Sequence, residues 1–170
     1  MRVTLVYPGF VNIGFNSLGR DNIDTRWINL GLAYIGAYLK ERGCVVDLID
    51  LRGLSGWDEF EAAVGKSDSP VFGVHFNTPN LDNALDCARL IKRAGKTVVA
   101  GGPHATISPQ ELLESGCVDY VIKGEGEISF LELLRDIEAG KTPPRIIEGK
   151  KAGDLDSLPF PDRELYPMRK

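Results

Sequence analysis

Several features that would place this chain in a familiar class are missing from its sequence. No segment of its 170 residues approaches the roughly 20 consecutive apolar residues that a membrane-spanning helix needs. The N-terminal apolar run, Val3–Tyr7, is far too short for a signal peptide, so we expect a cytoplasmic protein. There is no Lys/Arg-rich run, and the formal net charge is −4. Because nucleic-acid binding usually requires a basic surface, this balance argues against DNA or RNA as the main partner.

Cysteine and the common catalytic motifs are scarce or absent. The three cysteines, Cys44, Cys87 and Cys117, form no C-x-x-C pair, so we expect buried thiols rather than disulfides or a structural zinc site. The phosphate-binding patterns G-x-G-x-x-G and G-x-x-x-x-G-K-[ST] are also missing, which argues against nicotinamide cofactors and nucleoside triphosphates. Without a nucleophile elbow or a Ser-His-Asp order, the sequence indicates no self-sufficient catalytic set.

The chain does contain a regular alternation of two patterns. Continuous runs rich in Val and Ile predict strands buried on both faces: Val3–Tyr7, Val45–Ile49, Val71–His75, Thr97–Ala100 and Tyr120–Ile122. Helical spacing of apolar residues follows each run, over Leu30–Arg42, Trp57–Lys66, Leu81–Ala94, Pro109–Ser115 and Glu127–Ala139. Ser108 and Glu111 fit an S-x-x-E capping box before the fourth helix. This order predicts an α/β domain with a doubly wound, flavodoxin-like or Rossmann-like, five-stranded parallel sheet of order 2-1-3-4-5.

The last thirty residues differ in composition from the rest of the chain. Residues 1–140 form the predicted α/β domain, whereas residues 141–170 contain five prolines and form a Pro-rich C-terminal extension. Leu158–Pro161 cannot be helical, because each proline also restricts the residue before it. Arg145–Glu148 could add one further strand. We expect residues 141–170 to act as a strap over the domain or as a linker to a following domain.

Ligands of such sheets bind outside the carboxyl ends of the strands, where several loops here carry suitable residues. The first loop, Pro8–Asn29, is much longer than usual, so it is a functional loop or, alternatively, a lid or a packing surface. After the third predicted strand come Asn77 and Thr78, whose polarity could serve a ligand or only cap the next helix. His75, just before them, is interpreted as a satisfied packing residue.

Two glycine-containing loops are the most informative. Gly101 and Gly102 directly follow a buried strand, where missing side chains would let a ligand approach the backbone, and His104 comes just after them. The next loop, Lys123–Glu127, opens a helix whose N-terminus would attract anions, but its two carboxylates would repel phosphate. A large neutral ligand rich in hydroxyl and amide groups, or a docking partner, fits this edge better. Glu125 could accept hydrogen bonds from such a ligand.

Read together, these segments resemble a known family. Val99–Thr106 (VAGGPHAT), Asp119–Glu127 (DYVIKGEGE), the helix at Asn29–Leu39 and the tail at Leu155–Arg163 are similar to the N-terminal cobalamin-binding domain of B12-dependent radical S-adenosylmethionine enzymes. Within that family, the anaerobic magnesium-protoporphyrin IX monomethyl ester cyclase-like proteins look most similar. The resemblance implies that the nucleotide tail of cobalamin enters beside Gly101 and Gly102 and that the corrin ring lies across the strand ends. The cofactor-binding residues it implies are Asn77, Thr78, Gly101, Gly102, Pro103, His104, Ala105, Gly124, Glu125, Gly126 and Glu127.

Two departures from the family pattern shape the functional prediction. The D-x-H-x-x-G motif of other cobalamin proteins would fall at Pro8–Gly14, which contains no histidine, so we expect no protein histidine ligand to cobalt. The C-x-x-x-C-x-x-C of the radical barrel is absent, so S-adenosylmethionine and a 4Fe-4S cluster would belong to a missing domain of the same polypeptide. We therefore predict a cobalamin-binding domain that is inert alone and serves methyl transfer or oxidative cyclisation in the full-length enzyme. The alternative is a docking domain that has lost cobalamin and only packs against the catalytic barrel.

Overall fold

The computed structural model describes residues 1–9, 15–16 and 28–166 of the chain. It contains a parallel sheet of six strands in the order β2-β1-β3-β4-β5-β6. The strands are β1 (Arg2–Tyr7), β2 (Val45–Asp50), β3 (Val71–His75), β4 (Thr97–Gly101), β5 (Tyr120–Lys123) and β6 (Ile146–Glu148). The predicted Rossmann-like α/β class and the order of the first five strands are confirmed. The predicted count of five is wrong, because a sixth strand continues the sheet beside β5. It lies within Arg145–Glu148, the segment named as a possible further strand.

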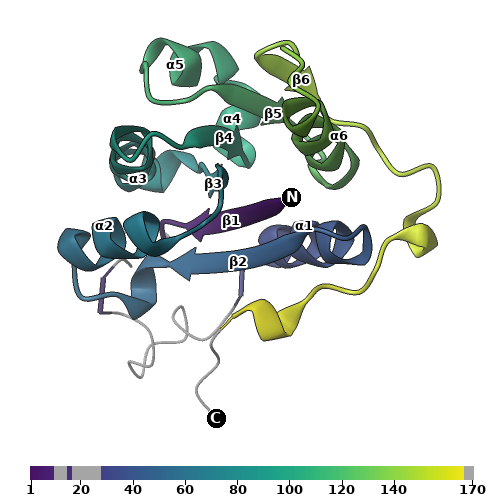
Figure 1. Ribbon diagram of the computed structural model, residues 1–170. Coiled ribbons are helices and arrows are strands. Elements are labelled where there is room, and N and C mark those ends of the chain that lie inside the picture. Colours follow the sequence, from purple (N-terminus) through teal and green to yellow (C-terminus); the bar gives the residue numbers. More distant parts are fainter. Residues whose placement is uncertain (10–14, 17–27, 167–170) are drawn as a thin grey trace.

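Helices cover both faces of the sheet. They are α1 (Leu30–Glu41), α2 (Trp57–Lys66), α3 (Leu81–Arg93), α4 (Pro103–Ile107), α5 (Pro109–Glu114) and α6 (Glu127–Glu138). Figure 1 shows α1 and α6 on one side of the sheet and α2, α3 and α5 on the other. Five of the helices match the predicted ranges to within a residue at either end. The short helix α4 was not predicted, because its residues read as a loop.

The two faces of the sheet bury two separate apolar clusters. Val6, Phe72 and Val98 pack toward α2, α3 and α5, together with buried residues such as Phe60, Ile91 and Leu112. Leu5, Val99 and Ile122 face α1 and α6, where they meet residues such as Leu39, Phe130 and Leu134. Because successive side chains on a strand point to opposite faces, strands covered on both sides are mostly apolar, as their sequences predicted. The buried Thr4 of β1 is an exception.

The C-terminal segment is fastened to the domain at both ends of its path. Strand β6 pairs in parallel with β5, with Val121 opposite Ile146 and Lys123 opposite Glu148. The chain then runs past α6 to α1, as the yellow end of the ribbon shows in Figure 1. There the backbone N–H of Asp162 donates to the carbonyl of Ala33 at 3.0 Å, and Lys40 pairs with the Asp162 carboxylate at 2.6 Å. The domain boundary predicted at residue 140 and the role of this segment as a linker remain predictions.

The sequence also predicted three buried cysteines and no membrane-spanning segment. Cys87 and Cys117 are buried, as predicted, but Cys44 is half-buried, so the expectation of three buried thiols is wrong for that residue. Burial raises the pKa of the Cys87 thiol, which makes it unreactive near neutral pH. Within residues 1–9, 15–16 and 28–166, no helix has the length and apolar character to span a membrane.

Candidate functional site

A cavity of about 320 Å³ opens at the carboxyl ends of the strands, between the sheet and the pair α1 and α6. Its floor comes from strand residues on the face that α1 and α6 cover, including Leu5, Gly73, Val99 and Ile122. Asn29, Gly31, Leu32 and Ile35 form one side, and Gly124–Glu127 with Phe130 form the other. The volume lies at the lower end of the range typical of small-molecule sites.

Missing side chains on one face of two neighbouring strands explain why this space is hollow. Gly73 on β3 lies opposite Val99, and Gly101 on β4 lies opposite His75. Both glycines occupy positions whose side chains would point toward α1 and α6, because strand residues alternate between faces. At Gly73 the ring of Phe130 fills the gap, since a Cβ there would come within 2.8 Å of it. At Gly101 a Cβ would meet nothing within 4 Å, so this position keeps the cavity open.

The adjacent glycines Gly101 and Gly102 have different roles. Gly102 has φ of +101°, a conformation that L side chains rarely adopt. A Cβ there would lie 2.7 Å from the carbonyl oxygen of Phe76, so the position also lacks space. Gly102 is therefore needed for the backbone path into α4. Gly101 is needed only for the empty volume above it.

A second hollow of about 300 Å³ adjoins the first at the strand ends. The two share Asn29, His75 and Pro103 in their walls. Tyr7, Asn77 and Thr78 line only the second hollow. Asn77 is 6% exposed, and its buried Oδ1 has no hydrogen-bond partner among the residues that the structure describes. A buried acceptor without a partner is costly, so a donor on a bound molecule would be favoured there.

The structure brings most of the predicted site residues together. Seven line the first cavity: Gly101, Gly102, Pro103, Gly124, Glu125, Gly126 and Glu127. Asn77 and Thr78 line the adjoining hollow. His104 and Ala105 line neither; both are buried, and Ala105 packs in the apolar cluster on the opposite face. Their roles toward a cofactor remain predictions.

Some wall residues were not predicted. The start of α1 contributes Asn29, Gly31, Leu32 and Ile35, and β3 contributes Gly73 and His75. The signal that could have found the β3 residues is the spacing of Gly73 and His75, two residues apart on one face beside Val99 and Gly101. The long first loop, residues 8–29, was also predicted to be functional, but most of it lies outside the described residues.

The polar residues after β3 do not cap helices, so that alternative interpretation of the loop is wrong. Neither Asn77, which precedes the 3-10 turn Thr78–Asn80, nor Asn80, which precedes α3, caps with its side chain. Asn80 instead donates from Nδ2 to the carbonyl of Pro8 at 2.9 Å and so joins β3 to the chain after β1. The capping box predicted at Ser108 is likewise absent, because Ser108 makes no side-chain bond to the start of α5.

The loop Gly124–Glu125 is held from two sides. From α4, the Thr106 hydroxyl donates to the carbonyl of Gly102 at 3.0 Å and accepts from the N–H of Gly124 at 2.9 Å. From beyond β6, the N–H of Gly149 donates to the carbonyl of Lys123 at 2.7 Å. A Cβ on Gly149 would collide with the Glu125 backbone. One hydroxyl therefore couples the two glycine loops that face the cavity.

We expect Thr106→Val to loosen this loop without changing the fold. Valine keeps the shape of threonine but loses both hydrogen bonds, which together contribute on the order of 1–2 kcal/mol. The free energy of unfolding, measured by urea denaturation, should fall by about that amount, whereas Thr106→Ser should stay near wild type. Equal stabilities of the Val and Ser variants would show that the hydroxyl does not bridge the loops.

His75 is not the satisfied packing residue that the sequence suggested. Its buried Nδ1 has no hydrogen-bond partner among the described residues. Its ring packs edge-on to Tyr7, with the ring centroids 5.9 Å apart, and lies against the backbone of Gly102. Burial lowers the pKa of His75 to about 4, so the ring is neutral at physiological pH. A neutral imidazole in the wall of a largely apolar cavity is suited to contact an uncharged ligand.

The depressed pKa predicts an acid-sensitive component of stability. With a pKa of about 4 in the folded state and 6.5 as the ordinary value, the unfolded chain binds more protons between these values. The contribution of neutral His75 to the free energy of unfolding is therefore present above pH 6.5 and is lost as pH falls toward 4. Relative to His75→Phe, which cannot titrate, wild type should lose about 3 kcal/mol between pH 7 and pH 4. Urea denaturation of both proteins at each pH measures this, and parallel pH profiles would contradict it.

Comparison with known protein families shows to which family this chain belongs. The family model of the B12 binding domain matches residues 17–134, which is more than half of the chain. The chain belongs to the B12-binding domain family. The family resemblance inferred from the two glycine loops is thereby confirmed.

Two curated relatives are similar to this chain in sequence, and one solved structure is similar to it in fold. The chain is 28% identical over 158 residues to an uncharacterized methyltransferase of Pyrococcus horikoshii, covering 83% of this chain and 34% of that protein. It is 26% identical over 147 residues to the anaerobic magnesium-protoporphyrin IX monomethyl ester cyclase of Rubrivivax gelatinosus, covering 83% and 25%. A solved structure with a similar fold is that of the cobalamin-dependent S-adenosylmethionine radical enzyme OxsB with aqua-cobalamin and S-adenosylmethionine bound. It superimposes with a TM-score of 0.72 at 17% identity, and the match covers 96% of this chain and 24% of OxsB. The chain thus spans about a third or less of these proteins.

The residues present in the cavity fit a B12 cofactor. The position of Gly101 leaves a space that a side chain would fill, in a cavity with apolar walls formed by residues such as Leu32, Ile35 and Phe130. Such walls suit a flat heteroaromatic base. The partnerless Nδ1 of His75 and Oδ1 of Asn77 lie beside this space. Within the described residues there is no cluster of three His, Cys, Asp or Glu that could hold a metal ion directly.

Proposed function

We propose that this chain binds cobalamin, with the nucleotide base in the cavity at Gly101 and the corrin ring over the ends of β1, β3 and β4. The observation that carries the proposal is the empty volume that Gly101 leaves on the α1 and α6 face of the sheet. Membership of the B12-binding domain family supports the choice of ligand. The adjoining hollow beside Asn77 and Thr78 is the natural place for the polar edge of the ring.

The chain's own residues would bind the cofactor and keep water from it. Ile35 and Phe130 enclose the base, and the backbone at Gly101 and Gly124 allows close approach. His75 lines both hollows, where its neutral ring can contact the ligand. That cobalt has no histidine ligand from this chain stays a prediction, which rests on the lack of a histidine at Pro8–Gly14. Cobalamin itself supplies the cobalt–carbon chemistry, and the protein supplies position.

The reaction served by the cofactor depends on more protein than this chain contains. We propose that a radical S-adenosylmethionine domain of the same polypeptide completes the enzyme and carries the 4Fe-4S cluster. Its support is the size of the relatives, of which this chain spans about a third or less. Similarity to the methyltransferase of Pyrococcus horikoshii supports methyl transfer as the reaction class, and similarity to the cyclase supports oxidative cyclisation.

Titration of the purified chain with hydroxocobalamin and methylcobalamin tests the binding proposal. We expect saturable changes in the visible spectrum, with the absorption of base-off cobalamin, because the base would be inserted in the protein. Calorimetry should give the same stoichiometry of one cofactor per chain. No spectral change at high micromolar cobalamin would contradict the proposal and would favour the docking-domain alternative.

A further inference from the structure

Three polar side chains in a row connect the protein surface to the second hollow. The Thr78 hydroxyl, in the wall of that hollow, lies 3.1 Å from Nδ1 of His104. On the other side of the same ring, Nε2 lies 3.3 Å from Oε2 of Glu111 on α5. His104 is 5% exposed, so its ring bridges two short helical segments inside the protein.

Glu111 is the partner available to the buried end of the His104 ring. The contact from Nε2 falls outside regular hydrogen-bond geometry, and Nε2 has no other partner among the described residues. The Glu111 side chain is 58% exposed, so its carboxylate can rotate into line at little cost. Leaving a buried N–H unpaired is the more costly arrangement. This contact gives Glu111 a role other than the capping role that its spacing from Ser108 predicted.

The position of Glu111 determines the donor and acceptor roles that the geometry favours. A carboxylate oxygen beside Nε2 acts as an acceptor, which favours the His104 tautomer with its ring proton on Nε2. Nδ1 is then an acceptor, and the Thr78 hydroxyl must donate its only proton to it. The lone pairs of Thr78 Oγ1 remain for a molecule in the hollow. Thr78 is therefore set as a hydrogen-bond acceptor toward any ligand there.

Asn77, which lines the same hollow, adds a second acceptor. Its Oδ1 is buried without a partner in the part of the chain that the structure describes. Two neighbouring acceptors favour a ligand group that offers N–H donors. The edge of the corrin ring has primary amide groups, which have two N–H donors each, whereas a carboxylate in their place would have none.

We propose that Glu111, acting through His104, holds Thr78 as the acceptor that selects a primary amide on the edge of the corrin ring. Thr78 is the contacting residue, and His104 and Glu111 are positioning residues. The inference rests on the proposed binding of cobalamin, which it refines by naming the ligand group that is recognised and the residues that recognise it.

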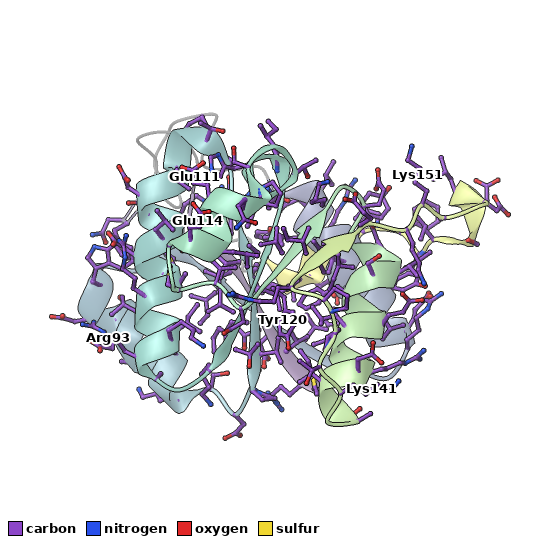
Figure 2. All side chains as sticks on the ribbon, turned by 90° about the horizontal axis from the view of Figure 1, so that it is seen from above. Arg93, Glu111, Glu114, Tyr120, Lys141 and Lys151 are labelled. Atoms are coloured by element: carbon purple, nitrogen blue, oxygen red, sulfur yellow. The ribbon has the colours of Figure 1, made fainter. Side chains whose placement is uncertain are left out.

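The test compares cobalamin with its monocarboxylic acids, in each of which one peripheral amide is hydrolysed to a carboxylate. Binding is followed by visible spectroscopy for wild type, Thr78→Val, Thr78→Ser, Glu111→Lys and Glu114→Lys. A lysine at 111 can only donate, so it would reverse the polarity of His104 and turn the Thr78 hydroxyl into a donor. Glu114, labelled with Glu111 in Figure 2, is an exposed residue of the same helix, and its replacement controls for the change in charge.

We expect wild type to bind at least one monocarboxylic acid about tenfold more weakly than cobalamin. Thr78→Ser and Glu114→Lys should keep this preference, whereas Thr78→Val should lose it and Glu111→Lys should lose or reverse it. If wild type binds cobalamin but Thr78→Val or Glu111→Lys keeps the full preference, the inference fails and the proposed function stands. If wild type does not bind cobalamin, both fail.

Discussion

Replacing Gly101 with leucine is expected to abolish cobalamin binding while the protein stays folded. The new side chain would extend from β4 into the cavity, where a Cβ meets nothing within 4 Å, and would occupy the space assigned to the nucleotide base. Because Gly101 does not have a positive φ, the backbone can accept a side chain without strain. We expect the dissociation constant to rise at least about 100-fold, equal to about 3 kcal/mol of binding free energy.

Two further glycine variants make this experiment specific. Gly65→Leu is the matched control, because Gly65 is exposed on α2 and a Cβ there also meets nothing within 4 Å. Gly102→Ala should instead lower stability, since its φ is positive and a Cβ would press on the carbonyl of Phe76. Visible titration gives affinity, and urea denaturation gives the free energy of unfolding. Normal affinity of folded Gly101→Leu would show that the ligand does not use this cavity.

Replacing Asp50 with alanine is expected to be the most destabilising single change in β2. Asp50 accepts from Nε of Arg52 at 3.0 Å and from its Nη2 at 2.6 Å, and both side chains are 2% exposed. The guanidinium carbon of Arg52 lies 4.8 Å from the ring centroid of Tyr7, which in turn contacts His75. Removing one partner of a buried ion pair is strongly destabilising, so we expect a cost of about 3–5 kcal/mol.

The same strand provides a matched exposed pair. Asp47 accepts from Arg2 at 2.8 Å, with both side chains more than 40% exposed. Surface pairs contribute little, so Asp47→Ala should change the free energy of unfolding by less than about 1 kcal/mol. Denaturation of both variants in urea measures the difference. Equal costs at positions 47 and 50 would contradict the importance of burial for this pair.

The sheet could be predicted from the sequence because its signals are local. Each of the first five strands contains a short run rich in Val, Ile or other apolar residues, and glycines with positive φ follow α1, α3 and α6 at Gly43, Gly95 and Gly140. Strand β6 has only three residues, so its place depends on pairing with β5 rather than on its own pattern. Helix α4 has five residues and begins at Pro103, directly after two glycines that indicate a loop.

The part of the site that could be predicted from the sequence is the part formed by backbone without side chains. The two glycine loops were found because missing side chains are visible in a sequence. The partners of buried polar atoms were not, because they depend on contacts between elements. Glu111 fits a capping box by its spacing from Ser108, yet its carboxylate lies beside His104. His75 looked like a satisfied residue because nothing in the sequence shows that its Nδ1 lacks a partner.

The position of β6 has a practical consequence for the preparation of this domain. A shorter version that stops at residue 140, where the composition changes, would turn β5 into an edge strand with a row of free N–H and C=O groups. Such an edge invites pairing with other chains and therefore aggregation. It would also remove Gly149, which supports the carbonyl of Lys123 at the base of the Gly124–Glu125 loop. A version that extends through Gly149 keeps β5 paired with the short strand β6 and keeps this support.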